Sequence, residues 1–121
     1  MLFTKLKAKA AHLILGESAE EQAHNFLIAK GLKPVCRNFN CKQGELDLIM
    51  TDKQTLVIIE VRYRKTDKYG SAVESITRAK QSRIIAATHV YLSTQKTDSA
   101  IRFDVVAISG NGKLDWIQNA F

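Results

Sequence analysis

The pattern of apolar and polar positions divides the first half of the chain into one segment with helical spacing and three segments with extended spacing. In chain order they predict a helix over residues 17–30, an extended stretch over 34–41, a strand over 45–50 and a central strand over 55–64. Gly31 ends the predicted helix. The last segment is a nearly continuous β-branched run, which is typical of a strand buried on both faces.

The second half of the chain predicts one more helix and one or two more strands. Ser71 and Glu74 resemble a capping box, so a helix is expected to begin near Ser71 and to end near residue 92. A strand over 102–109 follows, and Asn111-Gly112 signals a two-residue hairpin into a short last strand. This order of elements predicts an α/β protein, with a small mixed sheet flanked by helices.

Composition and charge narrow the class. The 121 residues are 45% apolar and 25% charged, which suits one domain over 16–121 preceded by a basic leader over 1–15. No apolar run approaches the roughly 20 residues that span a bilayer, so no membrane partner is expected. The apolar run over 10–15 is too short for a signal peptide, which favours a cytoplasmic protein. A net charge of +6 favours a nucleic-acid partner.

The two cysteines cannot by themselves build a disulfide framework or a structural zinc site. Their separation along the chain is odd, so Cys36 and Cys41 should point to opposite faces if they share a strand. That placement disfavours a bond between them and is consistent with a reducing compartment.

Several acids lie where the predicted strands should be apolar. Glu45 and Asp47 share the face of their strand opposite Leu46, and Glu60 interrupts the apolar run of the central strand. If the two strands form an antiparallel hairpin, Asp47 and Glu60 approach each other, and a divalent cation such as Mg²⁺ would relieve their repulsion. The alternative is a structural ion pair of Glu60 with Arg62 or with a helix lysine.

Both predicted helices carry charges at the edge of their apolar faces. In the first helix Glu20 lies on nearly the same line as Leu27, which makes it a third candidate for a site carboxylate. In the second helix Lys80 and Arg83 project along the apolar stripe, where they could reach a phosphate or the acids. The alternative is that their stems lie along apolar surface with the charges in water.

The acids occur within five longer stretches of sequence that belong together. These stretches are GESAEEQAHNFLIAKGL, RNFNCKQGELDLI, TLVIIEVRYR, YGSAVESITRAKQSRI and RFDVVAI, and they extend over 16–108. They resemble the YraN-like family, and the acids resemble the PD-(D/E)xK arrangement of nucleases. The resemblance implies a restriction-endonuclease-like αβββαβ core, as in Holliday-junction-resolvase-like nucleases. It places Glu20, Asp47 and Glu60 on the motif acids, and Lys80 and Gln81 on the helix that follows.

The resemblance also implies a function. It suggests a metal-dependent DNA endonuclease that cleaves phosphodiester bonds, with branched or structured DNA as a candidate substrate and recombination or repair as the setting. Asp47, Glu60 and Glu20 would hold Mg²⁺ or Mn²⁺. The residues expected to contact DNA are Lys80, Gln81, Arg64, Lys65, Lys68 and Arg83. No oligomer interface can be identified from the sequence.

Arg62 stands where the family pattern usually has the lysine of Glu-x-Lys. We place it among the catalytic candidates, but arginine keeps its proton and can steady a phosphate without acting as a base. We therefore expect weak cleavage by the natural chain and a gain from Arg62→Lys. The departure also favours an alternative, a non-catalytic DNA-binding or recombination accessory module. A third alternative, a protein-interaction subunit with an incidental basic face, predicts neither DNA binding nor cleavage.

Overall fold

The computed structural model describes residues 18–65 and 73–121, and these residues form two helices and one five-stranded sheet. The elements are α2 (Ala19–Ala29), β1 (Lys33–Cys41), β2 (Gly44–Asp52), β3 (Thr55–Arg64), α3 (Arg78–Ser93), β4 (Ile101–Ser109) and β5 (Leu114–Ile117). The strands lie in chain order across the sheet. Neighbours are antiparallel except β3 and β4, which are parallel. The α/β class and the predicted order of elements are confirmed.

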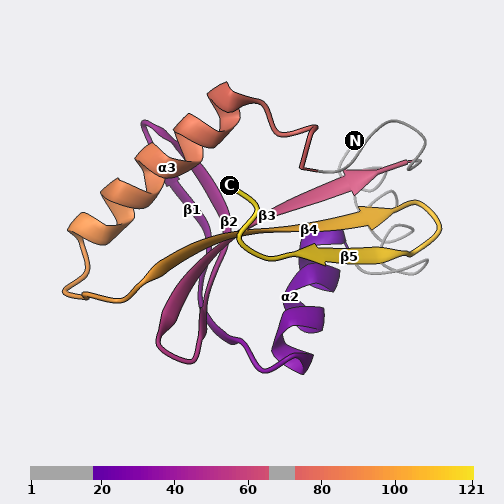
Figure 1. Cartoon of the computed structure of the whole chain (residues 1–121), viewed down its shortest axis with the longest axis horizontal. Helices are drawn as coiled ribbons and strands as arrows, with labels where there is room; N and C mark the ends of the chain where they lie inside the picture. The colour runs from indigo at the N-terminus through magenta and orange to yellow at the C-terminus, as the bar shows by residue number, and fades with distance from the viewer. Residues whose placement is uncertain (1–17, 66–72) are drawn as a thin grey trace, which may run out of the picture.

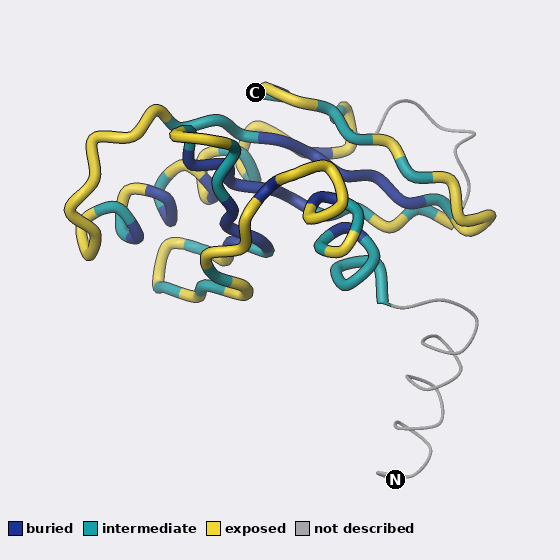
Figure 2. The backbone as a smooth tube through the Cα atoms, turned by 90° about the horizontal axis from the view of Figure 1, so that it is seen from below, coloured by how far each residue is buried: buried dark blue, intermediate teal, exposed yellow. Residues whose placement is uncertain are grey.

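The two helices cover opposite faces of the sheet (Figure 1). On one face Ala23 and Leu27 of α2 share an apolar cluster with Ile59 of β3, and on the other Ile84 of α3 packs with Ile58. Successive residues of β3 therefore supply both cores, which explains why its sequence is apolar on both faces. Figure 2 shows the buried positions following the central strands. Neither described helix combines the length and hydropathy needed to cross a bilayer.

Helix α3 begins later than the capping-box pattern predicts. Ser71 lies outside the described residues, residues 73–75 form a turn, and the helix starts at Arg78. Thr77 is its N-cap, because its side-chain oxygen accepts a hydrogen bond from the backbone N–H of Lys80 at 3.1 Å. The predicted start near Ser71 is therefore wrong, and the cap lies six residues further along the chain.

The β1–β2 hairpin bends halfway along its length. Strict alternation puts Leu46 and Leu48 on the same face of the sheet. In the structure, however, Leu46 packs with Ile49 on the α3 side, and Leu48 packs on the α2 side. The paired strand contains Asn38 in the left-handed region, with φ of 54°. Pairing of β2 with β3 also stops here, after Leu48↔Ile59. The predicted face of Leu46 is therefore wrong, because alternation assumes an unbent strand.

The same bend changes the placement of the cysteines. Cys36 and Cys41 both lie on β1, yet both pack against the apolar cluster on the α3 side. The prediction of opposite faces is wrong, because the left-handed Asn38 lies between them and interrupts the alternation. Both cysteines are free thiols.

The tip of the β1–β2 hairpin rests on α3. A Cβ atom at Gly44 would lie 3.2 Å from the carbonyl oxygen of Arg83, so a glycine permits this close approach. The contact ties the hairpin, which carries Asp47, to the helix that carries Lys80. The candidate site thus lies between two elements that are packed together.

The hairpin between β4 and β5 is present, but its loop is longer than the predicted two residues. The N–H of Gly112 donates to the carbonyl of Ser109, and the N–H of Ser109 donates to the carbonyl of Lys113, each at 2.9 Å. Gly112 takes a left-handed φ of 86°, whereas Asn111 does not. A turn followed by one left-handed glycine is typical of a three-residue hairpin loop.

Candidate functional site

Asp47 and Glu60 come together where β2 separates from β3. The ladder between these strands runs from Asp52↔Thr55 to Leu48↔Ile59 and stops one step before the two acids would pair. Asp47 Oδ2 instead accepts the backbone N–H of Val61 at 2.9 Å. The carboxylate of Asp47 thus replaces a strand partner and is held next to Glu60, as the sequence predicts.

Glu60 is a buried acid with an unusual proton affinity. Its side chain is 6% exposed. Burial raises the pKa of Glu60 from 4.5 to about 7, and the carboxylate of Asp47 acts in the same direction through charge and hydrogen bonding. The charges of Lys80 and Arg62 oppose this rise without cancelling it. Near neutral pH, Glu60 is therefore poised between its protonated and ionised forms.

Lys80 approaches the acids from the first turn of α3. Its Nζ lies 3.7 Å from Glu60 Oε1, and its side chain is 29% exposed. The structure thus contains the ion pair with a helix lysine that the alternative interpretation anticipates. A pair that fully compensated the buried charge would hold the pKa of Glu60 at or below its ordinary value, whereas the pKa is raised. The ion pair alone does not account for the acid.

Arg62 lies two residues beyond Glu60 on β3 and is hydrogen-bonded to the segment that precedes α3. Its Nη2 donates to the carbonyl oxygen of Ser75 at 3.3 Å. Its Nε is buried without a hydrogen-bond partner among the described residues. The charge of Arg62 lowers the pKa of Glu60, whereas its guanidinium donates to the backbone of Ser75.

The contacts of Glu20 are with residues of β1. Its Oε1 accepts a hydrogen bond from Asn38 Nδ2 at 2.9 Å and lies 3.6 Å from Arg37 Nη2, while the same arginine nitrogen pairs with Glu21 at 2.7 Å. Across 18–65 and 73–121 there is no group of three acidic, histidine or cysteine side chains spaced to hold a metal. Of the three predicted metal ligands, Asp47 and Glu60 are therefore the two that the structure brings together.

The residues predicted to contact DNA differ in their exposure to solvent and in their contacts. Gln81 donates to the carbonyl oxygen of Ile76 at 3.1 Å, so its amide stabilises the start of α3. Lys65 and Arg83 are exposed, and Arg64 is half-buried. Arg83 thus does not follow the buried stripe, because it lies on the flank of a helix whose buried residues are Ile84, Ala87, Thr88 and Tyr91. Lys68 lies outside the described residues.

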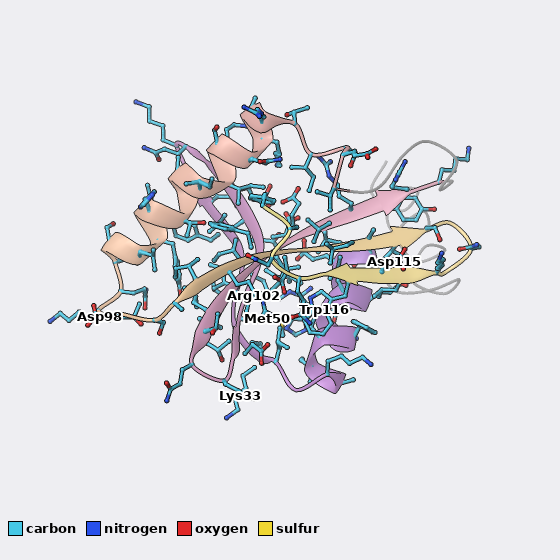
Figure 3. All side chains as sticks on the ribbon, viewed as in Figure 1. Lys33, Met50, Asp98, Arg102, Asp115 and Trp116 are labelled. Atoms are coloured by element: carbon cyan, nitrogen blue, oxygen red, sulfur yellow. The ribbon has the colours of Figure 1, made fainter. Side chains whose placement is uncertain are left out.

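A second buried acid, on the other face of the sheet, was missed by the sequence analysis. Asp104 of β4 is fully buried and accepts two hydrogen bonds from Arg102, one from Trp116 Nε1 and one from the N–H of Asn119. Arg102 also reaches Asp52 at 3.1 Å. Figure 3 shows Arg102 and Trp116 close together at the centre of the sheet. The Arg-x-Asp spacing, which puts both charges on one strand face, is the sequence signal for this cluster.

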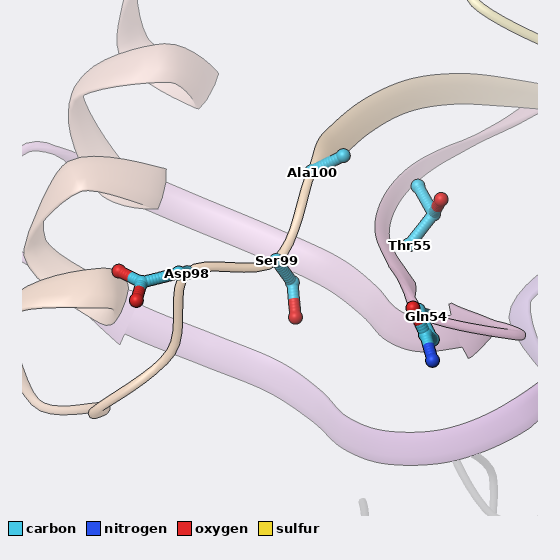
Figure 4. Close-up of a pocket in the computed structure, with 5 residues that line it drawn as sticks. All are labelled: Gln54, Thr55, Asp98, Ser99 and Ala100. Atoms are coloured by element: carbon cyan, nitrogen blue, oxygen red, sulfur yellow. The ribbon is translucent and has the colours of Figure 1, made fainter.

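A surface pocket lies where β3 begins. It is lined by Gln54, Thr55, Asp98, Ser99 and Ala100, from the β2–β3 turn and the segment before β4 (Figure 4). Strand residues advance about 3.3 Å each, so Thr55 and Glu60 are roughly 17 Å apart along β3. The pocket is therefore separate from the acid pair.

Fold and site together define a small α/β protein with a carboxylate pair at the point where two strands of its sheet diverge. The model of the uncharacterised protein family UPF0102 matches residues 19–108, and the chain belongs to this family, the YraN family. The resemblance drawn from the five stretches of sequence is confirmed.

Several curated relatives bear the same family name. The chain is 46% identical to the UPF0102 protein of Saccharophagus degradans over 114 residues, which cover 93% of this chain and 96% of the relative. It is 47% identical to that of Nitrosococcus oceani, covering 93% and 94%, and 48% identical to that of Hahella chejuensis, covering 88% and 89%. The chain and these relatives thus match along nearly their whole lengths.

Proposed function

We propose that this protein is a Mg²⁺- or Mn²⁺-dependent DNA endonuclease, with branched or otherwise structured DNA as the candidate substrate. The observation that carries the proposal is the Asp47–Glu60 pair at the divergence of β2 and β3, with a buried Glu60 whose charge the protein does not fully compensate. Perturbed acids of this kind cluster at functional sites.

The donor set fits a hard divalent cation. Mg²⁺ binds proteins through one or two carboxylates and keeps several waters, so Asp47 and Glu60 suffice as protein ligands. A backbone carbonyl near Val61 and water would complete the shell, and Glu20 would act through a water. A bound cation would polarise the phosphate and acidify an attacking water.

The chain's own residues have separable tasks in this proposal. Asp47 is oriented by the Val61 N–H, which leaves its other oxygen for the cation. Lys65 and Arg83 are exposed cations that would contact phosphates along the DNA. Sequence-independent contacts of this type suit an enzyme that recognises DNA shape.

Cleavage assays on supercoiled plasmid, linear duplex and four-way junction DNA test the proposal. We expect cleavage in Mn²⁺ or Mg²⁺ that stops in excess chelator. Asp47→Asn and Glu60→Gln should each reduce it by about 10³-fold or more, because metal ligation and charge stabilisation are lost together. Glu45→Gln, an exposed acid two residues from Asp47, is the matched control and should cleave normally. Equal cleavage by all variants would contradict the two-carboxylate site.

The rival is a DNA-binding or recombination accessory module that does not cleave. It is favoured by Arg62 at the usual lysine position and by the Lys80–Glu60 ion pair, which satisfies part of the acid's charge without metal. This rival predicts binding of the same DNA substrates with no cleavage in any metal. In both cases affinity should fall steeply with salt, by about −0.9 in log–log slope per neutralised phosphate of duplex DNA. Affinity indifferent to salt would contradict both.

A further inference from the structure

Two cations lie near Glu60, and their surroundings differ. Lys80 reaches it from α3, with Nζ 3.7 Å from the carboxylate and a partly exposed side chain. Arg62 lies on the same strand as Glu60 and donates to the carbonyl of Ser75. The first cation contacts the acid, whereas the second contacts the backbone of the segment before α3.

We infer that Lys80 is the cation of this site that contacts the scissile phosphate, and that Arg62 is a positioning residue acting through Ser75. The inference rests on the proposed function and deepens it, because it assigns the role of the motif lysine to a residue on another element. It reverses the expectation drawn from the motif alone, under which Arg62→Lys would raise activity.

The attachment of Arg62 supports its positioning role. Its Nη2 is bonded to the Ser75 carbonyl at 3.3 Å, and its Nε is buried from solvent. A planar guanidinium directs its donors in fixed directions, so the bond from Nη2 to Ser75 sets the orientation of the whole group. In its observed place Arg62 holds the turn that leads into the N-cap of α3.

The start of α3 is held by further contacts that aim Lys80 at the acids. Thr77 accepts the N–H of Lys80 at 3.1 Å, and the Gln81 side chain donates to the Ile76 carbonyl at 3.1 Å. The backbone of Lys80 is therefore fixed while its four-carbon stem stays adjustable. Such a side chain can turn its ammonium from Glu60 to a bound phosphate.

Charge balance gives a reason for this movement. Without metal, Lys80 is the cation that pairs with the buried Glu60, at 3.7 Å. A divalent cation held by the acids would repel the ammonium, and a negatively charged phosphate would attract it. In this role the Lys80 ammonium stabilises negative charge and takes no part in proton transfer.

Three measurements on the full chain test the inference: the plasmid cleavage rate, Mn²⁺ affinity from free-Mn²⁺ spin resonance, and amide hydrogen exchange over residues 73–81. Lys80→Met should lower the rate by about 10²-fold, the usual cost of losing one preorganised contact to transition-state charge. It should also tighten Mn²⁺ binding about 3-fold, because a positive charge beside the ligands is removed. Hydrogen exchange should not change. A merely structural lysine would not yield slower cleavage together with tighter metal binding.

Arg62→Met should give the complementary pattern. We expect exchange over 73–81 to accelerate about 10-fold, since a hydrogen bond to a charged donor is lost, with a smaller loss of rate than in Lys80→Met. Lys96→Met, an exposed lysine beyond the end of α3, is the control for charge removal and should match the natural chain in all three measurements.

The outcomes separate this inference from the proposed function. If the natural chain cleaves and Lys80→Met cleaves equally well, or if Arg62→Lys raises the rate 10-fold or more, the assignment of Lys80 is wrong and the nuclease stands. If the natural chain cleaves no DNA in any metal, the proposed nuclease function is wrong, and so is the phosphate contact assigned to Lys80. Weaker Mn²⁺ binding in Lys80→Met would contradict the charge argument in either case.

Discussion

Asp104 and Glu60 are buried acids on adjacent strands that face opposite sides of one sheet, and they are stabilised in different ways. Asp104 accepts four hydrogen bonds, two of them from the guanidinium of Arg102. Glu60 has one ammonium at 3.7 Å and a second carboxylate beside it, and its pKa is raised to about 7. Two acids can therefore both be buried and still differ in how completely their charge is compensated.

The difference lies in how completely each charge is compensated. A buried carboxylate that is paired and fully hydrogen-bonded contributes to a unique packing of its surroundings. One that is left next to another acid costs stability, and a site that binds a cation recovers this cost on binding. The comparison assigns Asp104 to the fold and leaves Glu60 as the acid available to the proposed chemistry.

The largest effect is expected from breaking the compensated acid. Asp104→Ala leaves Arg102 and Trp116 without their shared partner, and removing one member of a buried pair typically costs about 3–5 kcal/mol. Urea denaturation should show this loss in the free energy of unfolding. Asp115→Ala, an exposed acid on β5, is the control and should change stability by less than about 0.5 kcal/mol. A small loss of stability in Asp104→Ala would show that the hydrogen bonds to this acid are dispensable for folding.

The pH dependence of stability should reveal the uncompensated acid. The pKa of Glu60 is about 7 in the folded chain and about 4.5 when unfolded, so between these values the folded state holds a proton that the unfolded state has released. The contribution of Glu60 to stability is then greatest at low pH and falls as pH rises from about 4.5 to 7, by roughly 3 kcal/mol in total.

Denaturation in chelator from pH 5 to pH 8 measures this fall as the difference between the natural chain and Glu60→Gln, which cannot titrate. An opposite slope, with the natural chain gaining relative to Glu60→Gln as pH rises, would show that Lys80 fully compensates the acid.

Glu60→Gln should itself stabilise the metal-free protein at pH 8. An amide removes the repulsion with Asp47 and the cost of burying a charge, but it also removes the partner of Lys80. We expect a net gain of about 1–2 kcal/mol in the free energy of unfolding, less than the full pH effect. Excess Mn²⁺ should stabilise the natural chain and leave Glu60→Gln nearly unchanged.

The smallest loss of stability should come from removing one of the four hydrogen bonds to Asp104. Trp116→Phe deletes the indole N–H that donates at 2.9 Å while keeping an aromatic ring in contact with α2 through Phe26. The expected loss is about 1–2 kcal/mol, because the other three bonds remain. A loss as large as that of Asp104→Ala would mean that the indole ring, and not the acid, organises this cluster.

The order of elements was predictable because each has a local signature. The β-branched run of β3 identified the central strand, and the acids on β2 and β3 identified the pair of Asp47 and Glu60. The bend at Asn38 was not predictable, because the left-handed conformation arises where β2 leaves β3, a tertiary event. The start of α3 was misplaced because Ser71 and Thr77 are both good caps by composition.

The roles of individual charges depended on partners far away in the chain. Glu20 shares the apolar edge of α2 as predicted, but its contacts are Arg37 and Asn38 on β1. The aspartate of RFDVV was visible in the sequence, whereas its bond to Trp116 required the β4–β5 hairpin. Periodicity identifies which face a residue occupies and says nothing about which distant group it meets.

The parallel pairing of β3 with β4 also bears on how the chain folds. The meander of β1, β2 and β3 is built from contacts between near neighbours in sequence, whereas β4 can join only after the crossover through α3 has closed a long loop. Asp47 and Glu60 belong to the meander, so we expect them to meet before α3 brings Lys80 to them. Refolding in Mn²⁺, followed by stopped flow, should then be faster for the natural chain than for Glu60→Gln. If Mn²⁺ changes the refolding rates of both proteins equally, the crossover forms first.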